Sequence, residues 1–219
     1  MNDTVLFIDK PAGMTSFGVV ARVRRILTQR AGKKVKVGHT GTLDPFATGL
    51  MILVTGKECK NAGSYSKLDK IYEATFRLGQ VSTTGDPEGE ISDVSENRPT
   101  EEEIDTALRS FSGEILQRPP IFSAIKINGQ RAYKLARDGK EVEIPERKVT
   151  IYSITVIDYT YPELKIRTHV SSGTYIRSLA VDIGETLKTG AYCTDLRRTA
   201  ISKWGIDEAV QLSEMGINS

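Results

Sequence analysis

The sequence predicts an α+β fold in which a central mixed or antiparallel sheet is flanked by helices. Segments with strand-like alternation and segments with helical spacing are interspersed along the 219 residues, without the regular βαβ rhythm of a parallel sheet. Hydrophobic residues make up 39% of the chain and charged residues 26%, which is typical of an ordinary globular protein. The sequence shows no internal repeat and no Pro/Ser-rich linker, so we expect one catalytic domain over residues 1–219.

The N-terminal third is predicted to form strand, helix and strand in turn. Residues 5–8 are a short apolar run that ends at a Pro-Ala-Gly turn, which indicates a buried strand. Thr15 or Ser16 can cap the helix that follows, because Val19, Val20 and Val23 then recur at helical spacing. Leu50–Val54 is an apolar run with glycines nearby and is expected to be a central strand.

The rest of the chain alternates between strand and helix patterns. In 70–78 the apolar residues occupy every second position, and in 82–98 turn residues and acids predict an exposed hairpin or loop. Thr100 and Glu103 form a capping box at the start of an amphipathic helix. The remaining expected elements are a short helix at about 132–138, strands at 149–159 and 164–170, and a helix from 176 to 187.

Charge is distributed unevenly along the chain. The net charge is only +2, but residues 86–105 hold nine acids and one base. Outside this block the chain is clearly basic, so a folded protein could present a basic surface to a polyanion and keep the acidic segment elsewhere.

The segment Gly38–Gly49 contains the strongest candidate for a reactive group. Asp44 is the first acid after Asp9, and eight Lys or Arg residues but no carboxylate lie between Lys10 and Leu43. Such a basic run attracts phosphates, and a lone carboxylate next to it suits a reactive acid that meets a polyanion. The alternative is an ordinary turn, since Asp-Pro and Gly are common turn residues.

Other chemistries are disfavoured by composition. Two cysteines and two histidines lie far apart and match no zinc pattern, so we expect no metal and no disulfide framework. The N-terminus has no secretory pattern and the longest apolar run is far too short to span a bilayer. We therefore expect a cytoplasmic protein.

A second informative stretch, Ser171–Arg177, joins a strand to a helix. Thr174 is the expected N-cap, which places Arg177 in the first helical turn, where a cation opposes the helix dipole. This placement suggests an anionic partner for Arg177. The alternatives are a surface arginine or a structural pair with Asp182 or Glu185.

Several strings in this order resemble the TruB family, the bacterial pseudouridine synthases that modify the T-loop uridine of tRNA at position 55. The resemblance covers nearly the whole chain and rests on the strings at 9–16, 38–49, 70–72, 118–126, 173–177 and 196–198. It implies a pseudouridine-synthase fold. Many relatives continue into a C-terminal PUA domain. We expect this chain to work without one and a substrate as small as the T-arm stem-loop to suffice.

The resemblance also implies residue roles. Asp44 matches the catalytic aspartate, Tyr72 the tyrosine that stacks on the target base, and Arg177 the arginine paired with the aspartate. The implied substrate-binding positions are Tyr175 and Leu196 in the uracil pocket, His39 on the RNA surface, and Lys10 and Thr42.

The implied reaction needs no cofactor and no metal. The base must be flipped out of the folded loop, and a neighbouring guanidinium keeps a carboxylate ionised and oriented. The carboxylate can act as a nucleophile or as a base, and the sequence leaves both open. We expect a monomer with no required protein partner and no contact with membranes.

Two rival functions remain at this stage: an RNA-guided relative that shares the Gly-Thr-Leu-Asp-Pro core, and a non-catalytic RNA-binding or tRNA-folding protein. Phosphate contacts are expected from Lys33, Lys34 and Lys36. The alternative RNA path runs along Lys126, Arg131, Arg197 and Arg198.

Overall fold

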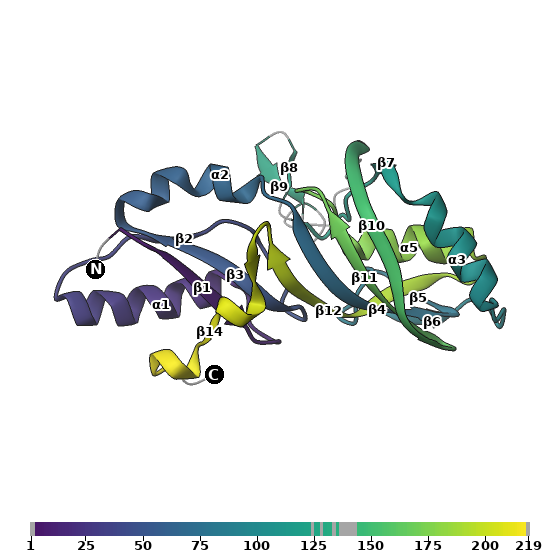
Figure 1. Cartoon of the computed structure of the whole chain (residues 1–219), viewed down its shortest axis with the longest axis horizontal. Coiled ribbons are helices and arrows are strands. Elements are labelled where there is room, and N and C mark those ends of the chain that lie inside the picture. The colour runs from purple at the N-terminus through teal and green to yellow at the C-terminus, as the bar shows by residue number, and fades with distance from the viewer. Residues whose placement is uncertain (1–2, 124, 128, 133–134, 136–143, 218–219) are drawn as a thin grey trace. The chain divides into compact units, whose positions relative to one another are not determined.

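The computed structural model describes residues 3–123, 125–127, 129–132, 135 and 144–217 (Figure 1). The chain divides into two compact units, residues 1–73 with 196–219, and residues 74–195. Strands β4 (Lys70–Leu78) and β12 (Ala191–Ile201) each run from one unit into the other. The expectation of one catalytic domain stays a prediction. Within the described residues, no helix is long and apolar enough to cross a membrane.

The first unit is built on a mixed sheet with the strand order β14-β1-β3-β12. Strands β1 and β3 are antiparallel, with Val5 opposite Val54 and Lys10 opposite Gly49, whereas β12 is parallel to β3 and β14 is parallel to β1. Its elements, besides parts of β4 and β12, are β1 (Val5–Lys10), α1 (Ser16–Ala31), β2 (Val37–His39), β3 (Thr48–Thr55), α2 (Ala62–Ser66), β13 (Trp204–Gly205), β14 (Val210–Gln211) and 3-10 turns at Gly56–Asn61, Ile206–Glu208 and Ser213–Met215.

The core of this unit is the central strand β3, which is buried from Gly49 to Thr55. Leu50 and Ile52 pack with Ile201 of β12, and Phe7 and Trp204 cover this cluster. Helix α1 begins where predicted, because the Thr15 side chain accepts a hydrogen bond from Gly18 N at 3.0 Å. The apolar run of β3 and the helical spacing of α1 were both sufficient to predict these elements.

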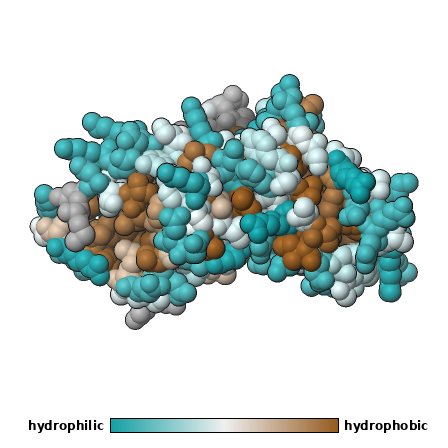
Figure 2. Space-filling view, in the orientation of Figure 1, coloured by the Kyte–Doolittle hydropathy of each residue, from teal (hydrophilic) through white to brown (hydrophobic). Residues whose placement is uncertain are grey.

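The second unit contains the sheet order β4-β11-β10-β7, and β10 is antiparallel to both of its neighbours. Its elements are β5 (Gln80–Ser82), β6 (Ile91–Asp93), α3 (Glu101–Ser110), β7 (Gly113–Gln117), β8 (Lys126–Ile127), β9 (Gln130–Arg131), β10 (Arg147–Thr160), β11 (Glu163–Val170) and α5 (Ile176–Thr186). The predicted capping box of α3 is present. Figure 2 shows apolar side chains at the surface over β10 and β11.

The predicted α+β class with a mixed sheet and flanking helices is confirmed. The alternation of β4 is confirmed as well, with Tyr72, Ala74, Phe76 and Leu78 all buried. The acidic hairpin is β5–β6. Strand β12 was missed, because Asp195, Arg197 and Arg198 interrupt its apolar pattern. Most of the helix expected at 132–138 lies outside the described residues.

Candidate active site

The predicted site residues fall into both units. Asp44, His39, Thr42, Lys10, Tyr72 and Leu196 belong to the first unit, and Arg177 and Tyr175 belong to the second. Each unit's share is described below by itself. The pairing of Asp44 with Arg177 stays a prediction.

Asp44 lies in the turn between β2 and β3, and its main chain is firmly held. Ser16 at the start of α1 accepts a hydrogen bond from Leu43 N at 2.8 Å, and its hydroxyl donates to Leu43 O at 2.9 Å. Ala47 N donates to Asp44 O at 3.2 Å, which closes the turn. Leu43 is buried while Asp44 is half-buried, so the turn is anchored through its neighbours and the carboxylate remains accessible.

Lys10 anchors the C-terminal side of this turn. It is fully buried at the end of β1, and its Nζ donates to the carbonyl oxygens of Pro11 (2.8 Å), Pro45 (3.1 Å) and Ala47 (2.6 Å). A buried cation is tolerable only when its donors are satisfied, and these carbonyls meet that requirement. The geometry therefore favours a role in holding the turn, and the substrate-binding role that the resemblance implies for Lys10 stays a prediction.

Arg198 of β12 holds the N-terminal side of the same turn. It is 1% exposed, and its guanidinium donates to Leu50 O at 2.7 Å and, over longer distances, to Thr42 O at 3.4 Å and Gly41 O at 3.3 Å. Its backbone approaches Gly49 so closely that a Cβ there would lie 2.3 Å from Arg198 O. Two positively charged side chains thus hold the main chain on either side of Asp44.

This burial removes Arg198 from the alternative RNA path that the sequence left open. Its neighbour Arg197 is hydrogen-bonded to both carboxylate oxygens of Asp9, at 2.8 and 3.2 Å. The side chains of Lys126 and Arg131 lie outside the described part of the structure. By contrast, the three loop lysines at 33, 34 and 36 are exposed.

The other predicted residues of the first unit lie on strands. His39 ends β2 and is half-buried, whereas Thr42 is exposed in the turn. Tyr72 of β4 and Leu196 of β12 are both buried, and these two strands are neighbours in the sheet. Lys70, on the same face of β4 as Tyr72, is also buried. That burial, and then repulsion from Arg198, lowers the pKa of Lys70 to about 8.

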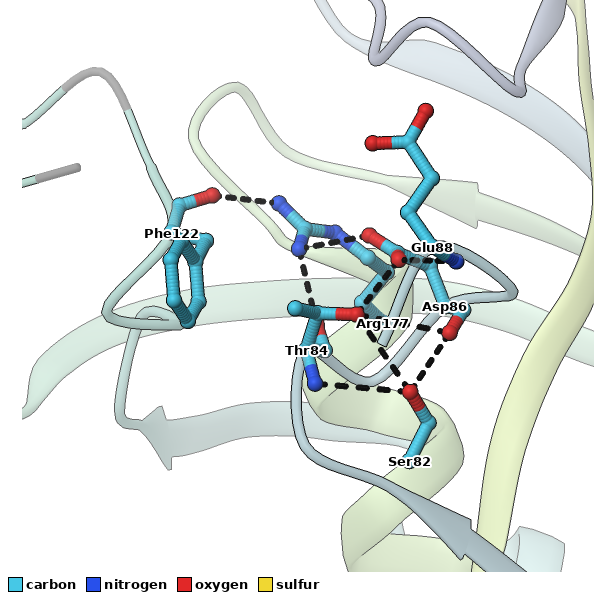
Figure 3. A network of polar contacts seen from close by, with 6 residues as sticks. All are labelled: Ser82, Thr84, Asp86, Glu88, Phe122 and Arg177. Carbon is cyan, nitrogen blue, oxygen red and sulfur yellow. Dashed lines mark hydrogen bonds and ion pairs between the residues drawn. The ribbon is translucent and has the colours of Figure 1, made fainter. Parts of the chain in front are cut away.

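In the second unit Arg177 is the centre of a buried polar network (Figure 3). Its Nη1 donates to Asp86 Oδ2 and to Thr84 O, both at 2.9 Å, and its Nη2 donates to Phe122 O at 2.8 Å. Arg177 is 3% exposed and Asp86 is 4% exposed. The guanidinium is thereby fixed in a definite plane, as a positioned arginine requires.

Arg177 has an anionic partner, as its place in the helix suggested, and the two alternatives that the sequence left open for it are excluded. Arg177 is neither a surface residue nor paired with Asp182 or Glu185; its buried acid is Asp86. The acidic block at 86–105 is largely exposed, but its first member turns inward. The sequence offered a signal, because Asp86-Pro87 repeats the Asp-Pro dipeptide of the Asp44 turn and follows the hydroxyl-rich run 82–84.

Tyr175 is held by a residue that the sequence did not single out. Gln117 is 1% exposed; its Oε1 accepts from Tyr175 N at 2.8 Å and its Nε2 donates to Tyr175 O at 3.0 Å. The Arg147 guanidinium lies 5.0 Å from the centre of the Tyr175 ring. The expected N-cap at Thr174 was wrong: its hydroxyl donates to Ser171 O, and Tyr175 occupies the cap position of α5.

A cavity of about 620 Å³ adjoins this network within the second unit. Thr84, Phe122 and Arg177 line it together with Arg118 and Asp182. Burial and the nearby Glu185 and Glu146 raise the pKa of Asp182 to about 6. Among the residues that the structure describes, no cluster of three or more His, Cys, Asp or Glu side chains is placed to bind a metal.

Comparisons with known proteins identify the family to which the chain is similar. Residues 24–176 match the model of the TruB family pseudouridylate synthase N-terminal domain. The chain is 44% identical over 227 residues to tRNA pseudouridine synthase B of Thermobifida fusca, covering 98% of this chain and 75% of that protein. It is also 44% identical to the Phocaeicola vulgatus protein of the same name, covering 95% and 89%.

Among solved structures, a Cbf5–Nop10–Gar1 complex contains a chain that is 30% identical, with a TM-score of 0.73. The match covers 98% of this chain but 56% of that one. The family match spans well over half of the sequence, and this chain belongs to the TruB family of pseudouridylate synthases.

Proposed function

We propose that this chain isomerises the T-loop uridine of tRNA to pseudouridine, with Asp44 as the catalytic carboxylate. The observation that carries the proposal is the 44% identity, over 98% of the chain, to a protein named tRNA pseudouridine synthase B. The firmly held turn around Asp44 supports the assignment of the carboxylate, because a reacting group has to be positioned by its surroundings.

The reaction is an internal exchange of bonds. The bond from C1′ to N1 of the uracil breaks, the ring turns, and a bond from C1′ to C5 forms. The proton at C5 is lost and N1 gains one, so atoms and charge balance without a redox partner. The Asp44 carboxylate either attacks the sugar at C1′ or removes a proton at C2′, and both routes require it to be ionised.

In this proposal the surrounding residues hold and orient that carboxylate. Lys10 and Arg198 donate to main-chain carbonyls on the two sides of Asp44. Arg177, fixed by Asp86, supplies the guanidinium that pairs with Asp44 in the assembled site. Tyr72 stacks on the flipped uracil, an arrangement that enzymes acting on a base in folded nucleic acid commonly use.

The remaining predicted residues recognise the substrate. Tyr175 and Leu196 line the uracil pocket, and His39 and Thr42 meet the RNA beside the Asp44 turn. The exposed loop lysines at 33, 34 and 36 contact phosphates. The chain acts without a guide RNA and without a protein partner.

The test is incubation of the purified protein with unmodified tRNA transcript, followed by mapping of pseudouridine by position. We expect modification at the T-loop uridine by the wild type and none by Asp44→Asn, with RNA affinity unchanged within about threefold because no cation is lost. Asp93→Asn is the matched control, since this exposed acid lies on the β5–β6 hairpin. Full turnover by Asp44→Asn would refute the assignment of Asp44 as the catalytic carboxylate.

The same assay separates the rival functions. An RNA-guided enzyme would modify its substrate only when a guide RNA is added. A non-catalytic RNA-binding protein would bind the transcript and leave every uridine unchanged. A T-arm stem-loop offered alone tests whether that part of the tRNA is sufficient.

A further inference from the structure

The turn that holds Asp86 contains two hydroxyl side chains whose hydrogen bonds all serve that turn. Figure 3 shows Thr84 next to both the Asp86 carboxylate and the Arg177 guanidinium, with Ser82 close to Thr84 and Asp86. All these residues belong to the second unit. Neither hydroxyl was assigned a role by the sequence, and Thr84 also lines the cavity next to Arg177.

We propose that Thr84 is a positioning residue that sets the orientation of Asp86 and, through it, of Arg177. The effect on turnover rests on the proposed function, in which Arg177 pairs with the catalytic carboxylate. Thr84 does not touch the substrate in this proposal. It acts by fixing both members of the buried ion pair.

The contacts of the Asp86 carboxylate carry the argument. The Thr84 hydroxyl donates to Oδ1 at 2.6 Å, and Glu88 N donates to the same oxygen at 3.0 Å. The other oxygen, Oδ2, receives Arg177 Nη1 at 2.9 Å. Each carboxylate oxygen therefore has its own donors, and the shorter of the two hydrogen bonds to Oδ1, from Thr84, helps to set which oxygen faces Arg177.

Thr84 also holds the arginine directly. Its main-chain carbonyl accepts a hydrogen bond from Arg177 Nη1 at 2.9 Å, the same nitrogen that binds Asp86. One residue thus binds the cation through its backbone and the anion through its side chain. Because hydrogen bonds to a buried ion are strong and directional, loss of the hydroxyl leaves Oδ1 with the Glu88 N–H donor and loosens the orientation of the carboxylate.

Ser82 also holds the turn that carries Thr84 and Asp86. Its hydroxyl donates to Asp86 O at 2.5 Å and accepts from Thr84 N at 3.4 Å. Gly85 anchors the turn to β12, because Gly85 O accepts from Cys193 N at 3.0 Å. With a φ of +73°, Gly85 also adopts a backbone conformation that favours glycine. These contacts hold the turn, so the Thr84 hydroxyl keeps a fixed position relative to Asp86.

The test replaces the hydroxyl without changing the shape of the side chain. Thr84→Val removes the donor and keeps the branched Cβ, Thr84→Ser keeps the donor, and Thr83→Val is the matched control. Thr83 is the exposed neighbour, and its hydroxyl accepts a hydrogen bond from Glu90 N at 3.0 Å on the β5–β6 hairpin. The measurements are the single-turnover rate of pseudouridine formation in tRNA transcript, the Kd for the same RNA, and the melting temperature.

We expect Thr84→Val to lower the single-turnover rate by about 10- to 100-fold, since small displacements of a catalytic group have effects of this size. The Kd should change less than about threefold, Thr84→Ser should recover most of the rate, and Thr83→Val should match the wild type. A wild-type rate in Thr84→Val, or equal losses in the Val and Ser variants, would overturn the proposal.

Two further results keep the inference separate from folding and from the proposed function. If Thr84→Val does not fold, Ser82→Ala decides, because a wild-type rate in that variant contradicts a positioning turn. If the wild type forms no pseudouridine, the proposed function fails. The crystal structure of Thr84→Val then still decides the positioning role, since an unmoved Asp86–Arg177 pair refutes it.

Discussion

The buried pair of Asp86 and Arg177 predicts a large loss of stability when one partner is removed. Asp86→Ala leaves the Arg177 guanidinium in a site that is 3% exposed, without the carboxylate that lies 2.9 Å from Nη1. Removing one member of a buried pair costs about 3–5 kcal/mol, because the remaining charge stays desolvated. Total stabilities of domains are about 5–15 kcal/mol, so this loss is easily measured.

The assay is urea denaturation followed by circular dichroism at pH 7. Glu163→Ala is the matched control, because its carboxylate lies 3.9 Å from Arg77 with both side chains substantially exposed. A surface pair of this kind contributes less than about 1 kcal/mol. We expect the Asp86 variant to lose several times more unfolding free energy than the Glu163 variant.

A double mutant tests whether the loss of stability comes from the unpaired buried charge. In Asp86→Leu/Arg177→Met no charge remains in the site, so the double mutant should be more stable than Asp86→Leu alone. The reasoning is refuted if Asp86→Ala costs no more than Glu163→Ala. It is equally refuted if the double mutant loses the full sum of the two single losses.

Three further predictions concern charge. Burial and Arg198 lower the pKa of Lys70 from 10.5 to about 8, so the unfolded chain binds more protons between these values and stability should rise with pH there; Lys70→Met should flatten that rise in urea denaturation series. Burial raises the pKa of Asp182 from 3.8 to about 6, so its stabilising contribution is present below pH 4 and lost by about pH 6; Asp182→Asn should therefore be about 1–2 kcal/mol more stable than the wild type at pH 7 and no different below pH 4. Replacing Lys33, Lys34 and Lys36 with Gln should weaken tRNA binding and reduce its salt slope by roughly 2–3 units, with little change in turnover at saturating RNA; an unchanged slope would mean that this loop does not contact phosphates.

Sequence periodicity predicted those elements whose burial follows the simple alternation or spacing of apolar residues. Strand β4 shows alternation, β3 is an apolar run, and α1 has a helical stripe with a hydroxyl cap. Strand β12 could not be predicted in this way. Its residue Arg198 is buried by hydrogen bonds to main-chain carbonyls of a turn about 150 residues away along the chain, and no local pattern records such a contact.

The site residues also fall into those that the sequence could single out and those that it could not. Asp44 stood out locally because it is a lone acid after a basic run, and Arg177 because it is a cation in the first turn of a helix. Family resemblance added Tyr72 and the pairing of Arg177 with Asp44. The supporting residues Asp86, Thr84 and Gln117 did not stand out, because each of them contacts Arg177 or Tyr175, which are distant in the sequence. Asp86 in particular lies in an acidic block that composition alone assigns to the surface.

The sequence by itself determined the fold class, the family and the candidate carboxylate, because these follow from local periodicity and from residue strings that occur in a fixed order. Only the tertiary structure decided which charges are buried and what they bind. Lys10 and Arg198 look like RNA contacts in the sequence, yet both are buried and donate to carbonyls beside Asp44. The physical reason is that a charged side chain enters the interior only when distant backbone and side-chain partners satisfy its hydrogen bonds, and those partners are brought together by the fold.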